Sequence, residues 1–486
     1  MPAQHNLSVS VENFGPVREG RFELRPLTIF IGPNNSGKSY MALLVYALSE
    51  ALLGRVHGRY MPRFWQSGRS RDGIAVAEEL GRWLMKELPP RGGRLSLQEM
   101  PEKPRAAVLK AMENGLSRVQ QQVEEVLRDY FGCASVVDLV RKGDDSEALA
   151  VRLNEAQGRA PLLSAEVHAN EARLRVKAPL PEVGWPAIRG PHGEPFHFWP
   201  EAPELFGLPE LLWAQLLSEN GVARDAYYLP AARSGILQGW QAFASIALQA
   251  VRQRVGLERI EVPPLAGVAG DFMQVLLERV MQPHVRRPRG DTKRMEAALR
   301  VLEEEAFAGE VYLETRGPAD RGLIFYKTKH LSLPLNRASS MVAELAPLVL
   351  WIKYLLGPGD LLIIDEPEAH LHPENQRRVA RALVRLVHAG VRVLCTTHSP
   401  TILHQVSNHV LACEASSQKR RRLGFTSDDL LEKNDVAVHL FDLQDDGTHI
   451  SPLTIVPGFG IPEDEFLRVS EAIGDETSRL ANPKAK

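Results

Sequence analysis

Residues 32–39, GPNNSGKS, have the types and spacing of a phosphate-binding loop that follows a short apolar strand. A glycine at each end lets the backbone bend so that successive N–H groups point at one anion, and a helix beginning at Lys38 adds its positive end. The Lys38 ammonium can reach the terminal phosphates of a nucleotide, and the Ser39 hydroxyl can bind Mg²⁺. The alternative is a glycine turn with an incidental lysine. The predicted phosphate-binding residues are Gly32, Pro33, Asn34, Asn35, Ser36, Gly37, Lys38, Ser39 and Tyr40.

A second candidate is the acid pair Asp365 and Glu366, which follows the apolar run Leu361-Leu-Ile-Ile364. An uncharged run of this kind predicts a parallel strand covered on both faces. Ligands bind at the carboxyl ends of such strands, where the strand before the glycine loop also ends. We therefore expect Asp365 to hold Mg²⁺ and Glu366 to take a proton from an attacking water. The alternative is a strand that ends in an acidic surface turn.

A third candidate, His398, follows the apolar segment Val391–Cys395. This segment comes after a predicted helix, residues 376–388, which Gly390 ends. Strand–helix–strand order builds a parallel sheet, so His398 is expected at the same sheet edge as a γ-phosphate sensor. The predicted catalytic residues are therefore Glu366, His398 and Lys38. His370 and His372 are spaced i, i+2 without a nearby cysteine, and this is a weak metal pattern.

The elements around these motifs predict an α/β fold of the P-loop NTPase type. Alternating apolar residues in 6–31 predict three short strands, and the helix after Ser39 is apolar nearly all round. Residues 76–90 and 104–130 are patterned as helices, and 159–200 as a strand-rich piece or long loops. We divide the chain into a first head segment (1–54), a mixed helical and strand-rich insertion (55–222), a helical lobe (223–309), a second head segment (310–465) and a tail (466–486).

The composition limits which binding partners and which cellular compartment we expect for the protein. The chain has 486 residues, is 24% charged and carries a formal net charge of -2, so charge gives no global reason for nucleic-acid or membrane binding. Three separated cysteines suit a reducing compartment, and the sequence has neither a signal-peptide pattern at its start nor a long apolar run. We expect a cytoplasmic protein that does not span a membrane. Two basic stretches, residues 284–294 and 419–422, could contact DNA, an acidic partner or only solvent.

The three motifs GPNNSGKS, IIDEPEAHLHP and TTHSP together resemble the ABC-type ATPases of the RecF, SMC/Rad50 and OLD group. More narrowly, they resemble the stand-alone AAA-15/AAA-21 ATPases of bacterial anti-phage systems of OLD-like, Septu and PARIS type. The resemblance covers residues 5–50 and 310–465 well and 226–236 loosely. It implies an ABC-type ATPase head with a large insertion, which binds ATP and Mg²⁺ between two subunits of a homodimer or higher oligomer.

The resemblance also implies a signature serine that contacts the nucleotide of the other subunit. Ser340 is the candidate for this contact in trans and Ser339 is second, with Met341 where the group usually has glycine. The alternative is a serine that only caps the helix 342–356. Gln238 and Gln241 are candidates for the Q-loop residue, or Arg233 in the same region faces phosphate (the pattern does not decide).

Two functions fit the resemblance. In the first, the chain is a slow ATPase switch of an anti-phage complex and controls a separately encoded effector, a nuclease, because the Toprim nuclease domain frequent in OLD-type chains is not seen here. In the second, it is a RecF-like DNA-repair ATPase. A transporter motor fits poorly, because the chain lacks the transport group's signature and an apolar membrane segment.

Overall fold

The structure is a computed structural model, and it describes the head motifs together with parts of the middle of the chain. The described residues are 6–52, 55–56, 59–60, 102, 105–106, 120–142, 148–155, 161–168, 174–177, 223–239, 267–280, 292–314 and 323–481. The predicted helix 76–90, most of the helix 104–130 and the basic loop 284–291 lie outside them.

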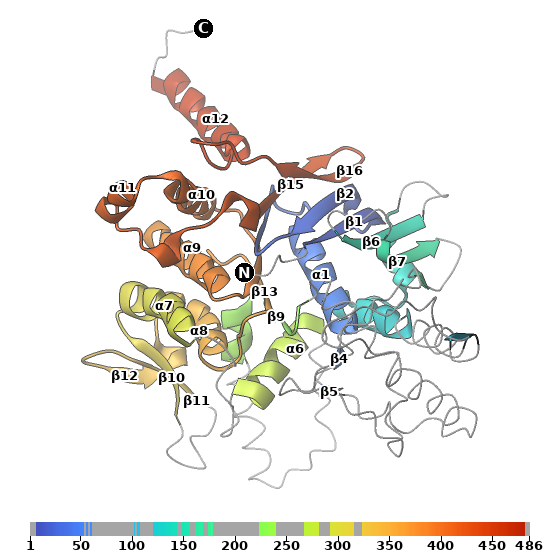
Figure 1. Ribbon diagram of the computed structural model, residues 1–486, viewed down its shortest axis with the longest axis horizontal. Helices are drawn as coiled ribbons and strands as arrows, with labels where there is room; N and C mark the ends of the chain where they lie inside the picture. The colour runs from blue at the N-terminus through green and yellow to red at the C-terminus, as the bar shows by residue number, and fades with distance from the viewer. Residues whose placement is uncertain are drawn as a thin grey trace.

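A sheet of eleven strands forms the centre of the molecule, in the order β8-β7-β6-β1-β2-β16-β15-β3-β14-β13-β9 (Figure 1). Its parallel half contains β3 (Leu27–Ile31), β9 (Ala226–Leu229), β13 (Leu361–Asp365), β14 (Arg392–Thr396) and β15 (Val436–Gln444). Every residue of β3, β13 and β14 is buried, as expected for parallel strands covered on both faces.

Register brings the ends of the parallel strands to one edge. Asp365 pairs with Thr396, and Thr396 pairs with Phe30, one residue before β3 ends. The glycine loop after β3, the acid pair at the end of β13 and the TTHSP motif at the end of β14 therefore meet at the same edge of the sheet.

Alternate residues of the parallel strands enter two separate cores. On one face, Ile29 and Ile364 pack with helices α8 (Ser340–Tyr354), α9 (Pro373–His388) and α10 (Pro400–Glu414). On the other face, Phe30 and Ile363 pack with α1 (Lys38–Leu52) and the helical residues 120–130. This is the three-layer α/β arrangement of a P-loop NTPase, as predicted.

Strands in mainly antiparallel pairs extend the sheet on the far side of β15, with β16 and β2 joined in parallel. They are β16 (Gly447–Leu453), β2 (Val17–Leu24), β1 (Leu7–Phe14), β6 (Ala148–Glu155), β7 (Pro161–His168) and β8 (Arg175–Lys177). β6 pairs with β1 from Leu7↔Glu155 to Glu12↔Ala150. Part of the segment that the sequence assigned to an insertion thus continues the sheet of the head.

The remaining elements lie around this body. The helical lobe contains α6 (Gly267–Val275), which continues as a π-helix (Leu276–Val280), and α7 (Thr292–Arg300), which continues as a second π-helix (Val301–Phe307). A hairpin forms from β10 (Glu310–Glu314) and β11 (Leu323–Lys327), with β12 (Ser332–Pro334) beside it. Short strands β4 (Arg55–Val56) and β5 (Arg59–Tyr60) pair with each other. The last elements are α11 (Ser417–Arg422) and α12 (Asp464–Ala481).

A buried ion cluster fixes α9 against the segment before β15. The Asp429 carboxylate receives hydrogen bonds from Nε of Arg381 and Nε of Arg385, both at 2.8 Å. Burial alone raises the pKa of this carboxyl, but the hydrogen bonds from both arginines outweigh it and hold the pKa well below its usual range.

Within the described part of the chain, no helix has the length and apolar character needed to cross a bilayer.

Candidate nucleotide-binding site

Two glycines of the loop occupy positions that no other residue could share without displacing a neighbour. Gly32 has φ +143° and Gly37 has φ +89°. A Cβ added to Gly32 would lie 2.4 Å from the backbone oxygen of Phe441, and one added to Gly37 would lie 2.7 Å from Cγ of Pro16. The glycine spacing is therefore a geometric requirement of this turn. Pro33, Asn34 and Asn35 are exposed on the loop, which leaves its outer side accessible.

The Lys38 side chain lies beneath the loop and is almost completely buried. Its Nζ donates to the carbonyl oxygens of Gly32 at 3.0 Å and Pro33 at 2.6 Å. Burial lowers the pKa of Lys38 to about 8, although the nearby carboxylates of Glu366 and Asp365 act in the opposite direction. At neutral pH the loop thus contains a cation with little access to water.

Ser39 and Asp365 are in direct contact. The Ser39 hydroxyl donates to Oδ1 of Asp365 at 2.9 Å, and the same oxygen accepts a hydrogen bond from the Thr396 hydroxyl. Mg²⁺ needs only one or two carboxylates because it keeps several water ligands, so a hydroxyl and a carboxylate that converge in this way fit it. The sequence did not assign Thr396, although it stands in the TTHSP motif.

Glu366 and His398 face each other at this edge. Nε2 of His398 lies 3.7 Å from Oε1 of Glu366, and both side chains are partly exposed, at 30% and 40%. Glu366 has φ +46°, a left-handed conformation that is uncommon for a residue with a side chain, and its N–H donates to the Thr396 carbonyl at 3.2 Å. Burial and then the Lys38 ammonium lower the pKa of His398, so its neutral imidazole is favoured at pH 7.

Glu368 contributes a contact that the sequence did not predict. Its Oε1 accepts from the Thr397 hydroxyl at 2.7 Å and from the His398 N–H at 2.6 Å. Burial raises the pKa of this carboxyl above its usual value, and this effect outweighs the same two hydrogen bonds, which act in the opposite direction. The glutamate thereby ties the turn after β13 to the backbone of the turn that carries His398. Glu368 stands in the DEPE run, but acidic residues occur in turns for several structural reasons, so the sequence alone does not predict this contact.

Arg233 does not face a phosphate. Its side chain is completely buried, and Nη1 donates to the Asp365 carbonyl at 2.8 Å. Nη2 lies 2.8 Å from Oε1 of Glu344, which is also completely buried. The arginine therefore supports the acid pair from below the sheet edge. Gln238 is exposed on the helical segment 233–239, and Gln241 lies outside the described residues.

The two signature candidates have different environments. Ser339 is the N-cap of α8, where its hydroxyl accepts from the Val342 N–H at 3.4 Å, so the capping alternative describes this serine. Ser340 is the first residue of α8 and is exposed. Met341 lies next in the chain, with its sulfur 2.7 Å from Nδ2 of Asn375 at the start of α9.

Two other candidates have structural contacts, and a third lies on an exposed helix. The Tyr40 ring packs against Phe14 and Phe131, with centroids 5.3 and 4.4 Å away, and burial raises its pKa to about 12. His372 is the N-cap of α9 and accepts from the Glu374 N–H at 3.3 Å. The basic run 419–422 forms the last turn of α11, which contains no buried residue.

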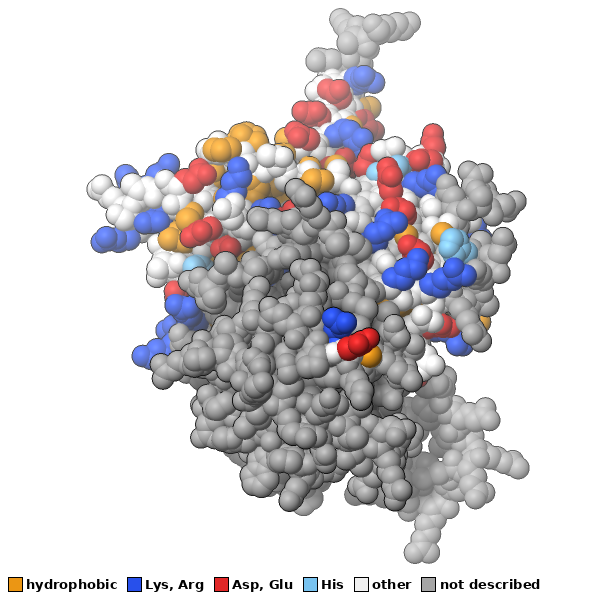
Figure 2. Space-filling view, turned by 45° about the vertical axis from the view of Figure 1, so that its right-hand side comes forward, with side chains coloured by type: hydrophobic (Ala, Val, Ile, Leu, Met, Phe, Trp, Pro, Cys, Tyr) orange, Lys and Arg blue, Asp and Glu red, His pale blue; other side chains and the backbone are white. Residues whose placement is uncertain are grey.

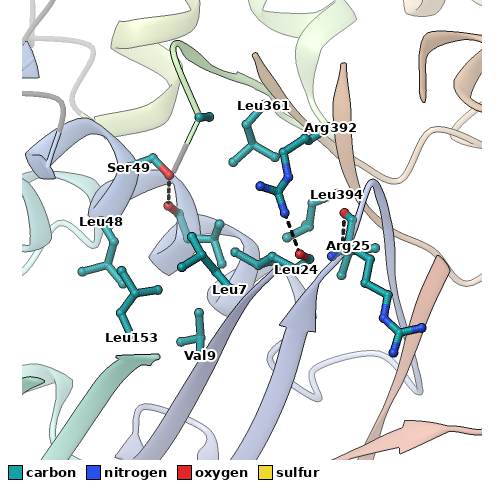
Figure 3. A pocket seen from close by; sticks show the side chains of 13 residues that line it. Leu7, Val9, Leu24, Arg25, Leu48, Ser49, Leu153, Leu361, Arg392 and Leu394 are labelled. Carbon is teal, nitrogen blue, oxygen red and sulfur yellow. Dashed lines mark hydrogen bonds between the residues drawn. The ribbon is translucent and has the colours of Figure 1, made fainter. Parts of the chain in front are cut away.

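A small cavity lies at the opposite edge of the sheet (Figure 3). Leu361 and Arg392, which begin β13 and β14, both line it, so it is at the amino ends of the parallel strands. The Arg392 guanidinium donates to the Leu24 carbonyl at 2.7 Å, and the remaining wall is mainly apolar. The charged groups described above are therefore separate from this cavity.

One family model matches part of the chain. A family model described as "AAA domain, putative AbiEii toxin, Type IV TA system" (AAA_21) matches residues 300–404, a range that contains the acid pair and His398. No curated protein matches the chain.

Solved structures similar to the chain include three SMC heads. One is an SMC head bound to the C-winged helix domain of ScpA, with 13% identity, a TM-score of 0.40 and coverage of 92% of this chain and 97% of that chain. A second is the SMC head domain from Thermotoga maritima, with 11% identity, a TM-score of 0.37 and coverage of 93% and 100%. The third, derived from Pyrococcus furiosus, is an Smc head with an extended coiled coil bound to the C-terminal domain of ScpA, with 11% identity, a TM-score of 0.38 and coverage of 96% and 98%.

Proposed function

We propose that this chain binds ATP with Mg²⁺ and hydrolyses the ATP slowly, as an ABC-type switch. The observation that carries the proposal is the 2.9 Å contact between the Ser39 hydroxyl and the Asp365 carboxylate, which are 326 residues apart in the sequence. A glycine loop with a buried lysine, together with Glu366 and His398, lies around this contact. This is the combination that phosphoryl transfer to water requires.

Each of these residues has a role in the proposed reaction. Ser39 and Asp365 would hold Mg²⁺, which neutralises developing charge on the phosphates when it is bound. Lys38 and the loop N–H groups stabilise the triphosphate electrostatically. Glu366, at the open side of the site, takes a proton from the attacking water, and His398 contacts the γ-phosphate.

We also infer that two copies act together. Ser340 is exposed at the N-terminus of α8, where the first N–H groups of a helix attract anions. In a homodimer, Ser340 of each copy would contact the nucleotide held by the loop of the other. Ser339 serves as the cap that holds this helix start in place.

The switch would control a separate effector, for which we propose a nuclease of an anti-phage system. The description of the matching family names a putative toxin of a toxin–antitoxin system, and this supports a place in a module that contains a toxic protein. Cys133, Cys395 and Cys413 are free thiols, which suits the cytoplasm. A RecF-like repair ATPase is the second candidate, and the exposed basic helix α11 is the feature that favours it.

The test of the proposed function is Glu366→Gln. The amide cannot accept the proton, so we expect hydrolysis to fall by about two orders of magnitude or more while ATP stays bound and the dimer accumulates. Glu374→Gln, a change of the same kind at an exposed position of α9, is the matched control. Hydrolysis by Glu366→Gln at the wild-type rate would remove the role given to this residue.

DNA and effector roles are separated by a second measurement. Stimulation of hydrolysis by DNA, with a steep loss of binding as salt rises, would support the repair alternative. Copurification with the nuclease encoded by a neighbouring gene, and toxicity when the two are expressed together, would support the switch.

A further inference from the structure

The C-terminal helix α12 stands away from the rest of the molecule. Within the described part of the chain, its start is held by a contact of 2.7 Å between Nδ1 of His404 and Oε1 of Glu463, and by partial packing of Phe466 on the core. None of its 18 residues is buried. Figures 1 and 2 show the helix projecting above the body, with charged side chains along it. Its faces are therefore accessible to another molecule.

One face of α12 carries a coiled-coil pattern. Phe466, Val469, Ile473 and Leu480 follow one another at intervals of three, four and seven, as in the a and d positions of heptads. Val469, Ile473 and Leu480 are 56%, 58% and 76% exposed. Leu467, which is 48% exposed, lies outside this stripe. A stripe of this kind gains stability when a second helix covers it. The stripe is interrupted once, by Glu476 at a d position.

The residues beside the stripe decide which helix fits. Ser470, Ala472 and Thr477 are small and uncharged, so they allow close approach of a second helix. The charged residues on these flanks are Glu465 and Arg479, at g positions two heptads apart. The other acids of the helix, Asp464, Glu471 and Asp475, lie on the outer face.

Pairing of α12 with itself is favourable in only one direction. In a parallel pair, Glu476 would face its own counterpart, and like charges would meet inside the seam. In an antiparallel pair, Glu476 lies opposite Phe466 of the second copy, and Glu465 lies opposite Arg479 of the second copy. The two-fold axis repeats this opposite-charge contact and brings the two Ala472 residues together.

We propose that α12 is a self-association helix, which pairs antiparallel with α12 of a second copy of this chain and does so without nucleotide. The contact involves far fewer residues than the 20–30 a side of a stable interface, so by itself it should be weak, with a Kd of about 10–100 µM. It is separate from the proposed ATP-dependent contact at Ser340, and its test needs no ATPase activity.

Charge reversal in the full chain tests the pairing. In nucleotide-free buffer with chelator, sedimentation velocity of the 54.0 kDa chain should show reversible dimer formation. Glu465→Arg and Arg479→Glu should each weaken it by about twofold to thirtyfold, because each removes two symmetric exposed ion pairs between the copies. Glu465 also pairs with Arg468 of its own helix at 3.1 Å, a contact that Glu465→Arg breaks and Arg479→Glu leaves in place. The double variant should restore the dimer, since the reversed charges meet again. Asp475→Arg on the outer face is the matched control and should change little.

A cysteine near the axis tests the direction. Ala472→Cys should form a disulfide-linked dimer under mild oxidation, and Asp475→Cys should give no more than the wild-type chain, which has its own three thiols. A chain that stays monomeric at several hundred micromolar, a double reversal that does not recover, or equal crosslinking at both positions would overturn the proposal. If α12 instead binds a different protein, the purified chain should stay monomeric, which is the first of these contradicting results.

Discussion

Replacement of Glu368 is the sharpest test of how the site is held together. The Glu368 carboxylate accepts from the Thr397 hydroxyl at 2.7 Å and from the His398 N–H at 2.6 Å. Both bonds end on the same oxygen, Oε1. A side chain with one suitable oxygen can therefore keep both, whereas a side chain without an oxygen loses both.

The expected effect follows from these two bonds. A hydrogen bond to a charged group contributes about 1.5–3 kcal/mol, and about 1.4 kcal/mol corresponds to a tenfold change in rate. If the bonds fix His398 for the transition state, Glu368→Ala should lower kcat about 10- to 100-fold. Glu368→Gln keeps an acceptor oxygen and should remain within about fivefold of wild type. The Kd for nucleotide should change less than kcat, because the bonded partners lie outside the glycine loop.

Steady-state ATP hydrolysis, with nucleotide affinity measured by calorimetry, gives both quantities. Thermal unfolding of each variant shows whether a loss of kcat reflects a loss of folded protein. Full activity of Glu368→Ala would refute the positioning role. Equal impairment of the alanine and glutamine variants would show that charge, rather than an acceptor oxygen, is what matters.

Three further predictions follow from the described contacts. Gly32→Ala should destabilise the protein by about 2 kcal/mol or more in denaturant unfolding, since the new Cβ would lie 2.4 Å from the Phe441 carbonyl oxygen. In binding titrations, the affinity for nucleotide should decrease as the pH rises above 8, by up to about tenfold for each pH unit. The reason is that the buried Lys38, with a pKa of about 8, loses its proton in this range. Asp429→Asn should cost about 3–5 kcal/mol near pH 7, since it leaves two arginines without their anion. The Asp429 pKa is depressed in the folded state, so the wild-type advantage is complete above about pH 4. It should decline progressively as the pH of the unfolding measurement falls below this value, and disappear only when the pH passes through the much lower pKa of the folded state.

The parallel core was predictable because its signals are local. The runs that became β3 and β13 contain no charged residue before the acids, and glycine or proline marks where each turn begins. Once these strands were assigned, sheet geometry alone brought Ser39, Asp365 and His398 to one edge. What each of them does with a nucleotide remains a prediction.

The antiparallel extension could not be predicted in the same way. β6 pairs with β1 across more than a hundred residues, and short alternating runs such as Ala148–Glu155 fit many partners. The choice depends on which edge is free once the rest of the sheet has formed, and that is a property of the whole fold. The contact made by Glu368 was missed for a related reason, because its partners follow a different strand.

Arg233 shows how burial resolves an alternative that spacing leaves open. Its guanidinium donates to the backbone carbonyls of Asp365 at 2.8 Å and Glu366 at 3.3 Å, and it pairs with Glu344, one turn inside the helix that begins at Ser340. Loss of one partner from a buried ion pair costs about 3–5 kcal/mol, so this link should persist while the protein works. The acid pair and the start of α8 are therefore joined through one side chain. A second subunit that displaces the Ser340 end of α8 would move the backbone of Glu366 with it, and this gives the proposed dimer a direct mechanical route to the carboxylate that we propose as the catalytic base.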